Sequence, residues 1–208
     1  MRLISLAGVL LGPLARAVDW TPVLATAVVS LGTAAATAPC AVVEPDSAAV
    51  TLRLAGVLLG AAAGFALVDV AAAATTATPV PRWLRQWIRT LLVTSAAAAA
   101  WAATFLVLAA RTADGTQLRA SGLATEAAVC LFGGLACTAV AVRRRPERLA
   151  AVTGAAALLT IAVSTLPCVE DVWPYLGNPR WDDVHLAWLT AGLVPLPALA
   201  VAHREVRT

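Results

Sequence analysis

The sequence contains no lysine. All fifteen basic residues of this 208-residue chain are arginines. A Walker-type phosphate loop needs a lysine that reaches the terminal phosphates of a nucleotide. This chain therefore cannot hold ATP in such a loop, and if ATP drives its work, a partner must bind the nucleotide.

Motifs for catalysis and redox chemistry are also missing. The four cysteines form no C-x-x-C pair, which leaves thioredoxin-like and zinc-ribbon chemistry without support. His185 and His203 fall at opposite ends of the last apolar stretch, so they cannot jointly ligate one haem or metal. The sequence shows no H-E-x-x-H motif and no Ser/His/Asp set. We expect no enzyme activity, no metal and no cofactor in this chain.

Apolar residues dominate what is present. They make up 60% of the chain, and the mean hydropathy is +0.81, far outside the range of soluble domains. Six stretches approach the roughly 20 residues needed to cross a bilayer core. They lie near residues 18–38, 52–76, 90–110, 120–142, 149–168 and 184–202. The predicted fold is all-α, a polytopic integral membrane protein whose residues 1–208 form one transmembrane domain.

The arginines alternate between the two sides of this threading. Eleven fall before span one, in the connections after spans two and four, or after span six: Arg2, Arg16, Arg82, Arg85, Arg89, Arg143, Arg144, Arg145, Arg148, Arg204 and Arg207. The other side holds Arg53, Arg111, Arg119 and Arg180. Because basic residues stay in the cytoplasm, both chain ends should be cytoplasmic and the protein should lie in the cell membrane. The net charge of +3 reflects these anchors and does not indicate nucleic-acid binding.

Residues 1–16 imitate a secretory signal, with Ala15-Arg16-Ala17 in the place of a cleavage site. Cleavage would break the charge alternation, so we expect the segment to stay. Residues 3–38 as one helix would be about 54 Å long, too long for one crossing. Pro13 and Pro22 offer break points. We therefore predict a short interfacial helix that leads into span one.

Span two carries Gly56, Gly60 and Gly64 on one helical face. Such a face lets a second helix approach closely. The alternative is that small residues are simply common in this alanine-rich chain. A disulfide between Cys40 and Cys168, which end spans one and five on the same side, is a second packing hypothesis. The alternative is two thiols that never meet, and Cys130 and Cys137 are expected to pack inside span four.

Two acids fall inside spans and are functional candidates by default. Asp69 lies in the inner half of span two, and its carboxylate could instead reach Arg82 or Arg85. Glu126 lies in the outer part of span four, and the simpler interpretation is that it extends to the outer interface. We expect neither acid to have the partner acid or histidine chain that a proton relay would show.

The connection before span three is amphipathic. Arg82, Arg85 and Arg89 share one helical face, and Trp83, Leu84, Trp87 and Ile88 share the opposite face. Such a helix suits a membrane surface. It is either an anchor of arginines and tryptophans at the start of the span or a cytoplasmic elbow that a partner can push.

The stretches LRLAGVLLGAAAGFALVD (52–69) and PVPRWLRQWIR (79–89) are similar to small membrane subunits of actinobacterial ABC exporters of the type-2 permease class. The resemblance implies six spans, a separate ATPase partner and a second copy or sister permease. It also implies that Arg82 to Arg89, or the helix before Arg16, couples to the ATPase, and that the loop from Trp173 to Trp181 forms an outer lid. The alternative is a non-transporting membrane protein, such as an immunity factor or the anchor of a complex.

The threading makes a direct prediction. A reactive tag added after Thr208 should stay protected from a membrane-impermeant reagent in intact cells and become reactive once the membrane is opened, because the arginine-rich side stays inside. Labelling of that tag from outside would contradict the predicted orientation.

Overall fold

The computed structural model describes residues 2–37, 42–68, 81–112, 118–144 and 147–204. These residues form helices and no strand, apart from one isolated bridge between Val43 and Thr112. The helices are α1 (Arg2–Ala17), α2 (Thr21–Ala36), α3 (Pro45–Ala63), η1 (Gly64–Leu67), α4 (Arg82–Ala109), α5 (Ala120–Arg144), α6 (Arg148–Ser164), η2 (Leu166–Cys168), α7 (Val169–Val172), α8 (Trp181–Gly192) and α9 (Pro195–His203). The all-α prediction is confirmed.

Within the described residues, five helical segments are long and apolar enough to cross a membrane. A sixth is reached if the end of α1, from Leu10, and α2 count as one span bent by 74°. Helices of this length and hydropathy indicate a membrane-embedded protein. The predicted number of six therefore depends on how α1 and α2 are counted.

Several boundaries differ from those predicted. The helix of span two starts at Pro45 rather than 52, because proline is well placed in a first helical turn. Residues 82–89 are the first turns of the continuous helix α4 and not a separate elbow, since no helix breaker separates them from the span. The last span is divided into α8 and α9 around residues 193–194, where Pro195 and Pro197 cannot donate backbone hydrogen bonds.

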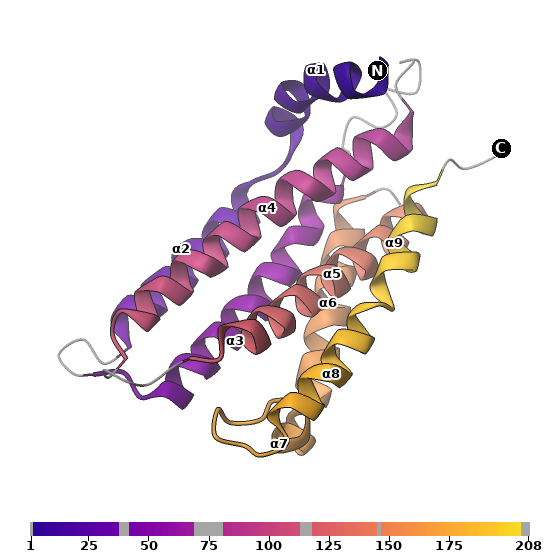
Figure 1. Ribbon diagram of the computed structural model, residues 1–208. Coiled ribbons are helices and arrows are strands. Elements are labelled where there is room, and N and C mark those ends of the chain that lie inside the picture. Colours follow the sequence, from indigo (N-terminus) through magenta and orange to yellow (C-terminus); the bar gives the residue numbers. More distant parts are fainter. Residues whose placement is uncertain (1, 38–41, 69–80, 113–117, 145–146, 205–208) are drawn as a thin grey trace.

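Helix α5 is central to the bundle. It packs against α3, α6, α8 and α9, while α2 lies against α3 and α4 (Figure 1). Figure 1 shows α1 and the last turn of α9 at one end of the bundle, with α7 at the other. We call these the terminal end and the α7 end.

Helix α1 crosses the terminal end. It turns sharply from α2 and packs on the first turns of α4, where Leu14 is buried with Leu84 and Ile88 (Figure 1). Two contacts hold the break between α1 and α2. The indole of Trp20 donates to the Ala15 carbonyl at 2.6 Å, and Arg148 pairs with Asp19 at 2.6 Å.

The three glycines of span two lie where α3 and α5 approach most closely. A Cβ on Gly56 would be 3.1 Å from Cα and Cβ of Ala127, and one on Gly60 would be 2.6 Å from the Cys130 carbonyl oxygen. A Cβ on Gly64 would collide with the Thr138 hydroxyl. These residues let two helix backbones touch, which favours association in lipid.

Gly60→Ala should therefore destabilise the protein by about 1–3 kcal/mol, because the new methyl group meets backbone that cannot move without shifting α5. The thermal unfolding midpoint of the detergent-purified chain measures this effect. Gly32→Ala in α2 is the matched control, since nothing lies within 4 Å of its Cβ. It should leave the midpoint equal or slightly higher. An equal loss in both variants would show that the α3–α5 contact is not the cause.

Candidate functional site

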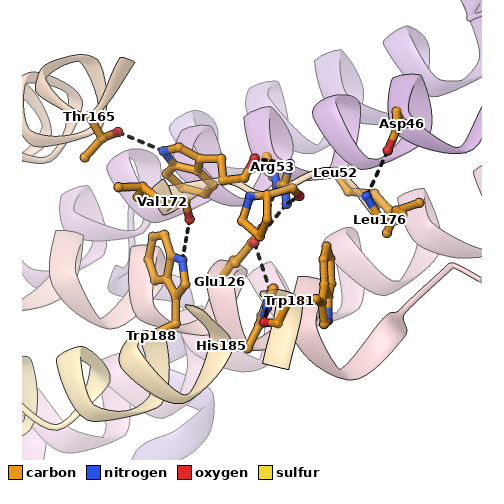
Figure 2. A network of polar contacts seen from close by, with 12 residues as sticks. Asp46, Leu52, Arg53, Glu126, Thr165, Val172, Leu176, Trp181, His185 and Trp188 are labelled. Carbon is orange, nitrogen blue, oxygen red and sulfur yellow. Dashed lines mark hydrogen bonds and ion pairs between the residues drawn. The ribbon is translucent and has the colours of Figure 1, made fainter. Parts of the chain in front are cut away.

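A cluster of charged and titratable side chains lies between three helices toward the α7 end (Figure 2). Arg53 of α3 donates from Nε to Glu126 Oε2 of α5 at 2.8 Å and from Nη2 to Oε1 at 3.0 Å. His185 of α8 places Nε2 3.1 Å from the same Oε1. Glu126 is 1% exposed, so both of its oxygens are removed from solvent and each has a partner.

Two glycines and their neighbours bring the cluster together. Gly56 of α3 lies in close contact with Ala127 of α5. Gly56 is about one turn after Arg53, and Ala127 directly follows Glu126, so this contact brings the two charged residues together. Gly122 lies one turn before Glu126 on the same face of α5. A Cβ there would be 2.6 Å from the Trp181 ring and 2.7 Å from His185 Nε2, so only glycine leaves room for α8 to deliver the histidine.

Arg53 also fixes the loop between α7 and α8. Its Nη1 donates to the Trp173 carbonyl at 3.2 Å and its Nη2 to the Pro174 carbonyl at 2.7 Å. The guanidinium carbon lies 5.8 Å from the Trp173 ring centroid and 6.0 Å from that of Trp181. One side chain thus joins the buried carboxylate to the loop by charge-assisted hydrogen bonds and cation–π contacts.

Further hydrogen bonds close the loop over the cluster (Figure 2). The Trp173 indole donates to Thr165 Oγ1 at 2.8 Å, and the Trp188 indole donates to the Val172 carbonyl at 2.7 Å. The Leu176 amide donates to Asp46 Oδ1 at 3.0 Å. These contacts tie the loop to α3, α6 and α8, so the loop forms a cap at the α7 end.

His185 joins two helices through its ring. Its Nδ1 lies 2.7 Å from the carbonyl oxygen of Trp181, one turn earlier in α8, and its Nε2 lies 3.1 Å from Glu126 Oε1 in α5. Because the carbonyl oxygen can only accept, the ring donates to it from Nδ1. The imidazole therefore links α8 to α5.

The prediction that Glu126 extends to the outer interface is wrong, because its carboxylate turns inward to Arg53. Arg53, which is expected on the outer side at the start of predicted span two, lies in the middle of α3 because this helix starts earlier, at Pro45, and its side chain is 11% exposed. The sequence contains a signal for the pair of Arg53 and Glu126. The two opposite charges lie at similar depths, each near the outer end of its span. The expectation that Glu126 lacks a histidine partner is also wrong, since His185 contacts it. His203 lies at the other end of the span formed by α8 and α9 and packs its ring on Trp87.

The candidate coupling residues lie at the terminal end, and the structure arranges them differently from the prediction. Arg89 is 3% exposed and donates to the Val68 carbonyl at 3.1 Å, so it faces the protein and offers no docking surface. Leu84 and Ile88 pack on α1 and not on lipid, so the other face of the helix, which carries Arg89, lies against the protein. Trp83 is exposed, whereas Trp87 contacts His203.

Other predicted site residues give no added chemistry. Asp69 and Cys40 lie outside the described residues, as does the proposed disulfide between Cys40 and Cys168. Cys168 is exposed at the end of η2, and Cys130 is buried in α5. Within the described ranges no three His, Cys, Asp or Glu side chains gather as metal ligands would. The contacts of Arg53, Glu126 and His185 join α3, α5 and α8.

Removing either charge of the Arg53–Glu126 pair should lower the free energy of unfolding by about 3–5 kcal/mol, because the other charge stays buried without a partner. We expect this for Arg53→Leu and for Glu126→Leu, measured by unfolding of the purified chain. The double variant should lose much less than the sum of the two. Additive losses would show that the two side chains do not depend on each other.

Comparison of the chain with protein-family models, with curated proteins and with solved structures found no match. The structure by itself establishes a helical, membrane-embedded protein with a buried Arg–Glu–His cluster beneath a capped end.

Proposed function

We propose that this chain is the membrane-spanning permease subunit of an ABC-type transporter in the cell membrane. It forms a translocation path together with a second copy or a sister permease. A separate ATPase subunit binds and hydrolyses the ATP, since the chain itself has no lysine for a phosphate loop. The sequence resemblance to type-2 permease subunits suggests this assignment.

The observation that carries the proposal is the joined platform at the terminal end. The two segments expected to couple to an ATPase, the leading helix and the first turns of α4, pack directly on each other through Leu14, Leu84 and Ile88. A force on α1 would thus reach α4 without an intervening flexible segment. Arg16 and Trp83 are exposed on this platform and available to a partner.

The charge distribution supports the orientation. Eleven of the fifteen arginines lie in the parts of the sequence that connect or end the spans on the side of the terminal end. Because basic residues stay in the cytoplasm, this end faces the cytoplasm, where an ATPase would be. The cap formed by α7 and the loop after it then lies outside. Arg53 holds this cap closed through the Trp173 and Pro174 carbonyls, as an outer lid of a translocation path requires.

Replacing Arg16 and Trp83 by alanine should weaken binding of the ATPase about thirtyfold, and so reduce its recovery when the tagged chain is purified from its native membrane, because loss of an aromatic anchor typically costs about 2 kcal/mol. The partner is identified by its phosphate-loop lysine and by ATP hydrolysis in the purified complex. The matched control is Arg180→Ala with Tyr175→Ala, an exposed arginine and an exposed aromatic at the α7 end. The control should retain the partner.

Two results would contradict the proposal. One is purification of the wild-type chain with no ATP-hydrolysing partner, which would favour a non-transporting anchor or immunity protein. The other is equal loss of the ATPase in both double variants, which would show that the platform of α1 and α4 does not contact it.

A further inference from the structure

A groove of about 560 Å³ runs along the outside of the bundle between α2, α3 and α6. Its volume is in the range of small-molecule sites. Most of its wall is apolar, with Val29 from α2, Leu54 and Leu58 from α3, and Leu159 and Val163 from α6. Several of these side chains are more than half exposed in the isolated chain, so the groove opens to the hydrocarbon of the membrane.

The groove has the length of an alkyl chain in one leaflet. Its wall along α3 runs from Asp46 to Leu58, twelve residues apart. At 1.5 Å per residue this is about 18 Å, slightly more than half of a hydrocarbon core that is about 30 Å thick. An extended chain lying in the groove would reach from the α7 end to near the middle of the bilayer.

The rim at the α7 end has an excess of negative charge. Asp46 and Glu170 line it and are both exposed. Arg53 also lines it, but Glu126 neutralises this cation, and Nε, Nη1 and Nη2 of Arg53 already donate to protein oxygens. The rings of Trp173 and Tyr175 complete the rim. Carboxylates beside aromatic rings recognise ammonium groups through charge and cation–π attraction.

One polar group inside the groove has no partner. Ser30 of α2 is 3% exposed, and its Oγ makes no hydrogen bond within the part of the chain that the structure describes. The neighbouring hydroxyls of Thr33 and Thr51 bond to carbonyls of their own helices. An alkyl chain offers this hydroxyl no hydrogen bond, so Ser30 does not select the occupant; the apolar wall and the charge of the rim do.

We infer that this groove binds an amphiphile with a single alkyl chain and a cationic ammonium head. The chain lies along α3 between α2 and α6, and the head rests between Asp46, Glu170 and the two rings. This binding is a property of the chain alone and is independent of the proposed ATPase coupling.

The test uses the full chain in nanodiscs of zwitterionic lipid, with a hexadecyltrimethylammonium probe that carries a photoreactive diazirine in its alkyl chain. We expect labelling of residues 45–63 and 148–164, mapped by mass spectrometry. Unlabelled hexadecyltrimethylammonium should compete, whereas hexadecyl sulfate at the same concentration should not. No ATPase is present, so the result does not depend on the proposed transport function.

Asp46→Asn combined with Glu170→Gln should weaken probe binding about tenfold, the effect of losing two partly exposed charge contacts. The carboxamide that replaces the Asp46 carboxylate keeps an oxygen for the Leu176 amide, so the cap should stay in place. The matched control is Asp182→Asn with Asp183→Asn, two exposed acids on α8 that do not line the groove. Unchanged unfolding midpoints verify that both double variants are folded.

Three outcomes would overturn the inference. Equal competition by hexadecyl sulfate would show that the rim does not select a cation. Equal labelling of α4, α8 and α9 would show that the probe only joins the surrounding lipid. Equal weakening in both double variants would show that the effect is one of general surface charge.

Discussion

The ion pair between Arg53 and Glu126 is the constraint on which the α7 end of the molecule depends. A carboxylate that is 1% exposed within an apolar bundle is costly unless it is paired and fully hydrogen-bonded. Arg53 meets that requirement and, with its remaining donors, holds the carbonyls of Trp173 and Pro174. The same guanidinium therefore sets the distance between α3 and α5 and the position of the cap.

Small residues make this arrangement possible. In lipid, no hydrophobic driving force brings one helix to another, so close backbone contact and buried polar bonds are needed. Gly56 and Gly60 provide the close backbone contact between α3 and α5, and Gly122 leaves space for His185 to reach Glu126. The contact between His185 Nε2 and Glu126 Oε1 then links α5 to α8, so three spans meet at one buried polar point.

The two ends of the bundle have different chemistry. The terminal end combines exposed arginines with a helix that lies across α4. The α7 end combines carboxylates, indoles and a loop closed by side-chain hydrogen bonds, and it borders the groove along α3. The proposed docking of an ATPase depends on the first end, and the inferred binding of a cationic amphiphile depends on the second.

The helical class and most spans could be predicted because composition and apolar length are local properties. Pro22, in the first turn of α2, predicts the break between α1 and α2, whereas Pro13 lies inside α1 and breaks nothing. The close contact of Gly56, Gly60 and Gly64 follows from their spacing. The cluster could not be predicted in the same way. Arg53, Glu126 and His185 are separated by 73 and 59 residues, and only the packing of α3, α5 and α8 brings them into contact. The burial of Arg89 could not be predicted for a similar reason. The sequence of a helical face does not show whether lipid or another helix will cover that face.

The sequence by itself determined which segments enter the membrane, because that depends on hydropathy and length. Only the tertiary structure decided which charges meet inside it, because a buried charge is stabilised by partners that other helices supply.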